Sequence, residues 1–438
     1  MSDPPKPYPA GTSSADDLTD QLAQAGLDND AALVRRNQTA PGKVDLKLEP
    51  VPVKHLGIVG CGLMGRSIAA LALGQDITIT MVDVAQSALT VARETFADDK
   101  RVTITDQYDQ LATAGLIIEA VVETLAVKKT VHERIESVAA PDATIASNTS
   151  SIPLASMEKH LHSPERFCGI HFCHPEVMSL VEVIAGPSTS AQTTANAVGF
   201  IRQLEKMPIA INDGAGFVVN RLLSAMLNQS LRLLSLGVAV TDIDAAMRKF
   251  GFKAGPFEII DIIGADTCMY AGRTMWEHKL ECVSLSPILP RLVKHGRLGR
   301  KAGVGFYKYP DPRGEALVDS ELQPLLDPYQ DSSELSDTGG AGKNQSDLAR
   351  QILVPVVLEA TRILEQEIVG DYRDIDLAFT HGLSFPQRRG GLLFWADQVG
   401  VAELVAMLNE RSDGDSSLKP TALLVSMASS GRGFYSAP

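Results

Sequence analysis

The sequence predicts an α/β domain with a Rossmann-type parallel sheet, followed by a duplicated all-α domain. Three observations support this fold class: a glycine-rich turn between an apolar strand and a helix, a series of short apolar runs after it, and a change to helical periodicity beyond Phe217. The 438 residues allow about three domains. We expect an N-terminal arm at 1–53, a sheet domain at 54–215, helical domains at 216–326 and 347–438, and a linker at 327–346.

The first expected strand leads into the turn Gly-Cys-Gly-Leu-Met-Gly. In this spacing Gly60 permits a tight turn, Gly62 leaves the backbone open to a pyrophosphate, and Gly65 lets the next helix lie close to the sheet. The first-turn amides of that helix, which begins with Leu63 and Met64, would then face the phosphates. The turn therefore predicts a dinucleotide site.

A second strand, Ile77-Thr-Ile-Thr-Met-Val-Asp83, follows that helix and ends in an acid about twenty residues beyond the turn. A carboxylate there can accept hydrogen bonds from the ribose hydroxyls of adenosine and repels a 2′-phosphate. Asp83 therefore predicts NAD rather than NADP. The alternative is a nucleotide-free α/β domain, which the combination of strand, turn and acid disfavours.

The rest of the sheet domain alternates short apolar runs with helical patterns, as a doubly wound sheet requires. The run from Leu116 to Glu123 is almost continuously apolar, which is typical of a buried parallel strand. The N-terminal residues contain one amphipathic helical pattern, at 15–25. We expect strands with their exit loops at 101–105, 116–123, 144–150, 167–172, 180–185 and 209–216, and helices at 87–96, 127–139 and 189–205.

Three short markers recur in the same order in the helical part, which predicts a duplicated domain. Coincidence is the alternative for matches this short. The Asp-, Ser- and Gly-rich stretch 327–346 fits a linker between the copies. The markers at 242–247, 255–264 and 305–307 recur at 374–379, 390–400 and 433–435.

Composition narrows the class of protein. The net charge of −13 argues against non-specific nucleic-acid binding. Five cysteines without a C-x-x-C pair fit a reducing compartment. The first residues lack the apolar core of a signal peptide, and no run is long and apolar enough to cross a bilayer. We therefore expect a cytoplasmic enzyme with no nucleic-acid partner and no membrane span.

A cluster of Cys168, His171, Cys173 and His174 resembles a set of metal ligands. If residues 167–174 form a strand, His171 and Cys173 point to one face while the other two point to the opposite face. All four cannot converge, so the pattern predicts that none of them binds a metal.

Two side chains on neighbouring strands could form a catalytic pair. An enzyme that oxidises an alcohol with a nicotinamide needs a base, and His171 lies at the end of its strand. Glu182 lies in the apolar run Leu-Val-Glu-Val-Ile, where burial would require a partner. A short connection through Pro175 could bring the carboxylate behind the imidazole and fix its tautomer. Ser150 and Asn220 could equally be local helix caps, and they matter only if they face His171.

These motifs resemble the 3-hydroxyacyl-CoA dehydrogenase family, and more closely the dehydrogenase portion of the bacterial multifunctional fatty-acid oxidation enzyme without its hydratase domain. The resemblance covers about Leu56 to Tyr309 and includes Glu359 and Gly390-Gly391 as marks of a second helical copy. The motifs on which the resemblance rests are the glycine turn, Glu-Ala-Val-Val-Glu123, Ser-Asn-Thr-Ser-Ser151, His171-Phe with Leu-Val-Glu182, Gly216-Phe-Val-Val-Asn-Arg221, Gly255-Pro-Phe-Glu-Ile-Ile-Asp261 and Gly-Arg-Lys-Ala-Gly-Val-Gly-Phe-Tyr307.

The resemblance implies reversible, NAD-dependent oxidation of the 3-hydroxyl of a 3-hydroxyacyl-CoA, in fatty-acid β-oxidation or related short-chain metabolism. It implies that His171 is the general base and Glu182 its partner. Ser150 and Asn220 would hydrogen-bond the substrate oxygens.

Further positions match family residues at the dinucleotide. Glu123, Lys128 and Lys301 match positions that contact it, and Ser150 lies in the same region. His174 replaces an asparagine that helps to position nicotinamide and substrate in the family.

One departure concerns the CoA moiety. The stretch between Asp83 and Leu116 is too short for the helical arm with which the family contacts CoA. A dehydrogenase of a non-CoA 3-hydroxy acid and a non-catalytic NAD-binding protein are therefore the alternatives. The expected partners are an acyl-CoA substrate and a hydratase or thiolase, and the expected assembly is a monomer or homodimer.

Overall fold

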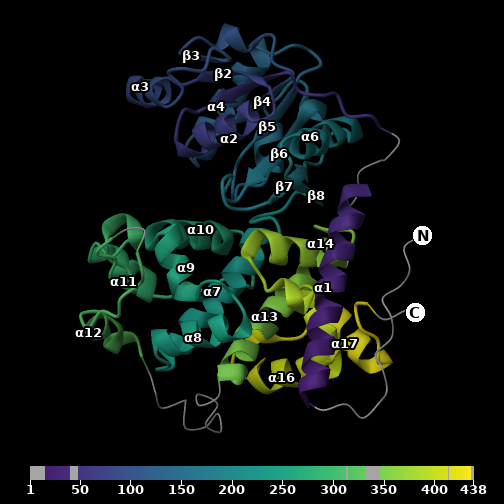
Figure 1. The fold of residues 1–438 in the computed structure, drawn as a ribbon, viewed down its shortest axis with the longest axis vertical. Coiled ribbons are helices and arrows are strands. Elements are labelled where there is room, and N and C mark those ends of the chain that lie inside the picture. Colours follow the sequence, from purple (N-terminus) through teal and green to yellow (C-terminus); the bar gives the residue numbers. More distant parts are fainter. Residues whose placement is uncertain (1–14, 40–47, 312–313, 331–344, 413, 436–438) are drawn as a thin grey trace. The chain divides into compact units, whose positions relative to one another are not determined.

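The computed structural model describes residues 15–39, 48–311, 314–330, 345–412 and 414–435, and these divide into two units (Figure 1). The sheet unit comprises described residues within 31–219 and 366–382, and the helical unit comprises those within 1–30, 220–365 and 383–438. Helix α1 (Ala15–Thr39) begins in the second unit and ends in the first. The predicted linker lies mostly outside the described residues, so it stays a prediction, as do the predicted domain boundaries.

The sheet unit contains one eight-stranded sheet among the described residues, with flanking helices. Its strands are β1 (His55–Val59), β2 (Thr78–Val82), β3 (Val102–Thr105), β4 (Leu116–Glu119), β5 (Thr144–Ser147), β6 (Phe167–Phe172), β7 (Leu180–Ala185) and β8 (Met207–Asn212). Its helices are α2 (Leu63–Leu73), α3 (Gln86–Thr95), α4 (Leu125–Val138), α5 (Ala155–Glu158), α6 (Ala191–Gln203) and α14 (Tyr372–Leu377).

The strand order is β3-β2-β1-β4-β5-β6-β7-β8. Strands β1 to β6 run parallel to one another, so the predicted Rossmann-type class is confirmed. The prediction of a parallel sheet was wrong for its last part, because β7 is antiparallel to β6 and parallel to β8. The connection between β6 and β7 holds no crossover helix, and a connection this short can join only antiparallel strands.

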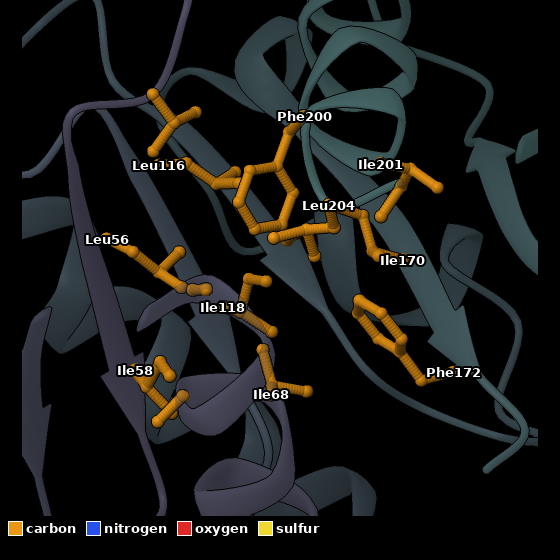
Figure 2. Packing of buried hydrophobic residues seen from close by; sticks show 14 of the residues in the cluster. Leu56, Ile58, Ile68, Leu116, Ile118, Ile170, Phe172, Phe200, Ile201 and Leu204 are labelled. Atoms are coloured by element: carbon orange, nitrogen blue, oxygen red, sulfur yellow. The ribbon is translucent and has the colours of Figure 1, made fainter. Parts of the chain in front are cut away.

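The core of the sheet unit lies between one face of the sheet and two helices (Figure 2). Alternate strand residues point to this face because side chains alternate along a strand. They are Leu56 and Ile58 of β1, Leu116 and Ile118 of β4, and Ile170 and Phe172 of β6, and they pack with Ile68 of α2 and with Phe200, Ile201 and Leu204 near α6.

Several predicted elements have different bounds. The strand predicted at 116–123 ends at Glu119. The amide of Val121 donates a hydrogen bond of 2.8 Å to the Glu119 carboxylate and not to a neighbouring strand. The helix predicted at 15–25 continues to Thr39, where Arg36 forms ion pairs with Asp371 and Asp374. Tertiary contact therefore extends α1 beyond its amphipathic pattern.

The described part of the helical unit consists mainly of helices. Among its described residues no single helix is long and apolar enough to cross a membrane, and only the pair α15 (Leu392–Val399) and α16 (Val401–Ser412), bent by 89°, reaches that length and composition when taken together. The helices are α7 (Val219–Ser235), α8 (Val240–Phe250), α9 (Pro256–Ile263), α10 (Ala265–Glu277), α11 (Ile288–Lys294), α12 (Gln323–Leu326), α13 (Gln345–Glu365), α15 (Leu392–Val399), α16 (Val401–Ser412) and α17 (Ala422–Ser430).

The predicted duplication is visible as a repeated set of hydrogen bonds. Asp261 at the end of α9 accepts the amides of residues 306 and 307 at 2.8 and 2.9 Å. Asp397 at the end of α15 accepts the amides of residues 434 and 435, both at 2.8 Å. Each helix ends at a glycine with positive φ, 105° at Gly264 and 99° at Gly400. The short recurring markers therefore correspond to one structural motif used twice.

We predict that Asp261→Ala destabilises the helical unit more than Asp397→Ala does. Asp261 is 1% exposed and also accepts the Tyr309 hydroxyl at 3.0 Å, so its removal leaves three donors without their acceptor. Each lost partner of a buried donor costs about 1–3 kcal/mol. Burial raises the pKa of Asp261 to about 6, so urea unfolding should be measured well above that pH. An equal loss in the free energy of unfolding in the two variants would contradict the larger structural role that we assign to Asp261.

Candidate active site

The predicted catalytic pair forms across β6 and β7. His171 lies opposite Glu182 in the antiparallel register, which places both side chains on one face of the sheet. The imidazole Nδ1 is 2.7 Å from Glu182 Oε2, and the two residues are only 2% and 0% exposed. Glu182 Oε1 accepts the amides of Val218 and Val219 at 2.8 and 3.0 Å. These contacts orient the ring so that Nε2 points away from the carboxylate.

The surroundings of His171 change its acidity. Burial by itself lowers the pKa of the imidazole, but the neighbouring Cys173 and the Glu182 carboxylate together raise this pKa well above its ordinary value. The Phe217 ring lies 5.7 Å from the imidazole, centroid to centroid, and is tilted by 50° to it. A protonated ring is therefore stabilised here, as an acid–base residue that returns its proton to the substrate requires.

The glycine turn has the shape that a dinucleotide needs. Gly60 has φ +113°, and a Cβ there would lie 2.5 Å from the carbonyl oxygen of Ala120. A Cβ on Gly65 would lie 1.9 Å from the carbonyl oxygen of Gly60, so neither position accepts a side chain. At Gly62 a Cβ would meet nothing within 4 Å. The open space in front of Gly62 and the start of α2, where Leu63 is 70% exposed, fits a pyrophosphate.

Asp83 follows β2 and holds this turn. Its carboxylate accepts the amide of Cys61 at 2.7 Å and the amide of Ala85 at 2.9 Å. A carboxylate has about four acceptor sites, so two bonds leave capacity for ribose hydroxyls. The residues present therefore fit NAD: the turn and α2 would hold its phosphates, and Asp83 would hold its adenosine ribose.

We predict that Asp83→Ala raises the dissociation constant for NADH by about tenfold or more, because a hydrogen bond to a charged group contributes about 1.5–3 kcal/mol. Fluorescence titration of NADH measures the change. Asp142→Ala is the matched control, because Asp142 is an exposed acid of the same unit that precedes β5, at the opposite edge of the sheet. Undiminished affinity in Asp83→Ala would exclude the proposed ribose contact.

Ser150 lies exposed in the loop after β5, and Glu123 organises this loop. One oxygen of Glu123, Oε1, accepts the hydroxyl of Thr149 at 2.7 Å and the amides of Ser150 and Ser151 at 2.9 and 3.1 Å. Lys128 is 1% exposed, and its ammonium lies 3.2 Å from the other oxygen of Glu123. Both residues therefore support the loop that carries Ser150, and their direct contact with the dinucleotide stays a prediction.

A buried polar cluster behind this loop was missed by the sequence reasoning. The carboxylate of Glu119, at the end of β4, accepts hydrogen bonds from Lys128 Nζ at 2.8 Å and from Ser147 Oγ at 2.7 Å. It also lies 3.0 Å from His132 Nε2. Although burial raises the pKa of Glu119, the hydrogen bond from His132 and the charge of Lys128 hold it at about 2. The sequence pattern that could have predicted this cluster is an acid inside an apolar strand, because a buried acid needs partners. Lys128 and His132, four residues apart on one face of the next helix, could supply them.

The remaining predicted residues lie in different parts of the chain. His174 is exposed at the turn after β6, where its carbonyl oxygen accepts the amides of Val177 and Met178. Asn220 lies in the first turn of α7, and Lys301 lies 2.6 Å from Asp266 within the helical unit. The expected contacts of Asn220 and Lys301 with substrate and dinucleotide stay predictions.

Comparison with known families places the site in context. Residues 55–100 and 98–214 match the model of the 3-hydroxyacyl-CoA dehydrogenase NAD binding domain. Residues 216–309 match the model of the 3-hydroxyacyl-CoA dehydrogenase C-terminal domain. The first match agrees with the prediction of NAD from Asp83.

Individual relatives agree with these models. The fatty acid oxidation complex subunit alpha of Pseudomonas aeruginosa is 32% identical over 409 residues, which cover 87% of this chain and 56% of that protein. The chain thus spans little more than half of the curated relatives that it matches. The structure of (S)-3-hydroxybutyryl-CoA dehydrogenase from Ralstonia eutropha is 31% identical, with a TM-score of 0.56 over 59% of this chain and 100% of that one. The 3-hydroxybutyryl-CoA dehydrogenase of Escherichia coli, 24% identical, shares the fold over 87% of this chain and 99% of its own, with a TM-score of 0.73.

Proposed function

The chain belongs to the 3-hydroxyacyl-CoA dehydrogenase family, and from this premise we propose that it reversibly oxidises the 3-hydroxyl of a 3-hydroxyacyl-CoA to the ketone. The observation that carries the proposal is the buried pair of His171 and Glu182, 2.7 Å apart. Strands β1 and β6 both belong to the parallel part of the sheet, so the glycine turn and His171 lie at the same edge of the sheet. That edge is where ligands bind in open α/β sheets.

The proposed mechanism uses His171 as the proton acceptor. Nε2, the nitrogen that Glu182 does not engage, would take the proton of the 3-hydroxyl, and Glu182 would stabilise the resulting imidazolium. The chemistry that a bound NAD supplies is acceptance of the hydride from C3. In the reverse direction the imidazolium would return the proton to the substrate oxygen. Ser150 and Asn220 are proposed to hydrogen-bond the 3-oxygen and the thioester carbonyl.

The test is the reduction of acetoacetyl-CoA by the purified chain, followed as loss of NADH absorbance. We expect saturable turnover. If NADH binds but a panel of acyl-CoA and free acid substrates gives no turnover, the chain is a non-catalytic NAD-binding protein and the proposal is wrong.

A second candidate follows from the segment between β2 and β4. Residues 83–115 hold only α3, β3 and a short 3-10 helix at 108–111, with no long helical hairpin in this fully described stretch. A contact to CoA from this segment is therefore reduced, which favours a smaller 3-hydroxy substrate. Comparison of acetoacetate with acetoacetyl-CoA at equal concentration decides between the two, since a true CoA enzyme should strongly prefer the thioester.

The names of the relatives also suggest an assembly. Because curated relatives are alpha subunits of a fatty acid oxidation complex, we propose that a hydratase or thiolase acts with this chain. Co-elution of the chain with such enzymes from the same cell would test the partnership.

A further inference from the structure

We propose that the side chains of His171, Cys173 and Glu182 form a site for Zn²⁺, or for a similar divalent cation, which switches off the catalytic pair. Their donor atoms, one from each side chain, all lie within 4.8 Å of one another. Among the described residues, this is the group of His, Cys, Asp and Glu side chains that meets this criterion. It combines nitrogen, sulfur and oxygen, the ligand types that zinc binds.

The geometry needs only small adjustments to take the ion. Cys173 Sγ lies 3.9 Å from His171 Nδ1, and Glu182 Oε2 lies 2.7 Å from the same nitrogen. Zinc bonds of about 2.0 Å to nitrogen and about 2.3 Å to sulfur, at a tetrahedral angle, separate those atoms by about 3.5 Å. The thiol therefore moves inward by about 0.4 Å. A zinc bond of about 2.0–2.2 Å to oxygen places the carboxylate oxygen about 3.3–3.4 Å from the same nitrogen, so this oxygen moves outward by about 0.6–0.7 Å.

Glu182 is prepared to act as a ligand. Its Oε1 is held by the amides of Val218 and Val219, so Oε2 keeps a fixed direction towards His171. Cys173 is partly buried just beyond the end of β6, two residues after His171 and on the same side. Three protein ligands would leave the fourth zinc position for water or substrate.

This inference revises the sequence prediction that no metal binds. The alternation argument separated Cys168 and His174 from the other two residues, and Cys168 is indeed fully buried in the core cluster. It did not include Glu182, because that residue joins the group only through the cross-strand pairing with His171. The antiparallel register supplies the third ligand.

Metal binding and base catalysis exclude each other at this site. The ion would take the position of the proton between Nδ1 and Glu182, so the carboxylate could no longer stabilise an imidazolium on His171. The Cys173 thiol would also lose its proton, so zinc affinity should rise with pH. The glycine turn and Asp83 take no part, so NADH binding should be unaffected.

The experiment uses the full, untagged chain freed of metal with a chelator. Calorimetric titration with Zn²⁺ is expected to give one ion per chain, and Co²⁺ is expected to give a thiolate-to-cobalt charge-transfer band. Removal of a residue that only supports a metal ligand already weakens metal binding about 10- to 100-fold. Cys173→Ser should therefore weaken zinc binding by at least about tenfold, and it should abolish the charge-transfer band. Cys268→Ser, at a partly buried thiol of the helical unit, is the matched control and should retain both.

The outcomes separate this inference from the proposed function. Equal zinc affinity in wild type and Cys173→Ser, or an equal loss in Cys268→Ser, would overturn the site. NADH titration of Cys173→Ser verifies that the variant is folded. A chain that shows the cobalt band but no turnover would contradict only the proposed dehydrogenase activity. An active chain that zinc does not inhibit, and that shows no cobalt band, would contradict only the metal site.

Discussion

His171→Gln is expected to lower the kcat of acetoacetyl-CoA reduction by about 10²- to 10⁴-fold, the usual contribution of a general acid–base residue. The glutamine can neither give nor take the proton of the substrate oxygen. Affinity for NADH should be retained, because the hydrogen bonds of Asp83 to the glycine turn and those of His171 to Glu182 involve separate groups. Single-turnover kinetics with NADH would measure the loss.

The matched control for this variant is His160→Gln, since His160 is an exposed histidine of the same unit. Its activity should equal that of wild type. Full activity in His171→Gln would remove the base from the proposed mechanism, whereas loss of NADH binding together with activity would indicate unfolding rather than a catalytic effect.

Glu182→Gln is expected to lower kcat by at least about 10²-fold, because the carboxylate both orients the imidazole and stabilises its charged form. The amide retains an oxygen that can accept the amides of Val218 and Val219, so the local structure should survive. The loss therefore reports on the negative charge. Glu182→Ala, which also removes the acceptor of those two amides, should be less stable as well as inactive.

The pH profile distinguishes an electrostatic from a merely structural role of Glu182. In the wild type, interactions with Cys173 and Glu182 raise the pKa of His171 despite its burial. Oxidation needs the neutral ring, so its rate should rise as the pH passes this raised pKa; reduction needs the imidazolium, so its rate should fall over the same range. Without the carboxylate, both limbs should move to lower pH. If both pH–rate profiles of Glu182→Gln stay at the wild-type pH, the charge of Glu182 does not act on the imidazole.

The dyad could be read from the sequence because its geometry is short-range. The bounds predicted for β6 and β7, 167–172 and 180–185, agree with the structure, and a short connection fixes their register. Once two such strands pair, His171 must face Glu182 or the buried acid would lack a partner. The glycine turn is local only in part: Gly65 packs against the carbonyl oxygen of Gly60, whereas the space at Gly60 is limited by the carbonyl oxygen of Ala120, which follows β4.

Other parts of the site depend on residues that are distant in sequence. Glu119 meets Ser147 and His132 only because β4 lies beside β5 and is covered by α4. Residues 366–382 belong to the sheet unit although their sequence pattern repeats that of a helical segment. No periodicity within a segment encodes which distant element will cover it.

By itself, the sequence determined the glycine turn, the acid after the second strand, the pairing of His171 with Glu182 and the repeated helical motif, because each depends mainly on backbone preferences and side-chain spacing within one or two adjacent elements. Only the tertiary structure decided the parallel pairing of β8 with β7, the burial of Glu119 and Lys128, and the convergence of Cys173 with the pair. These depend on which buried groups find partners across the fold. That choice is made by the free energy of the whole packed unit.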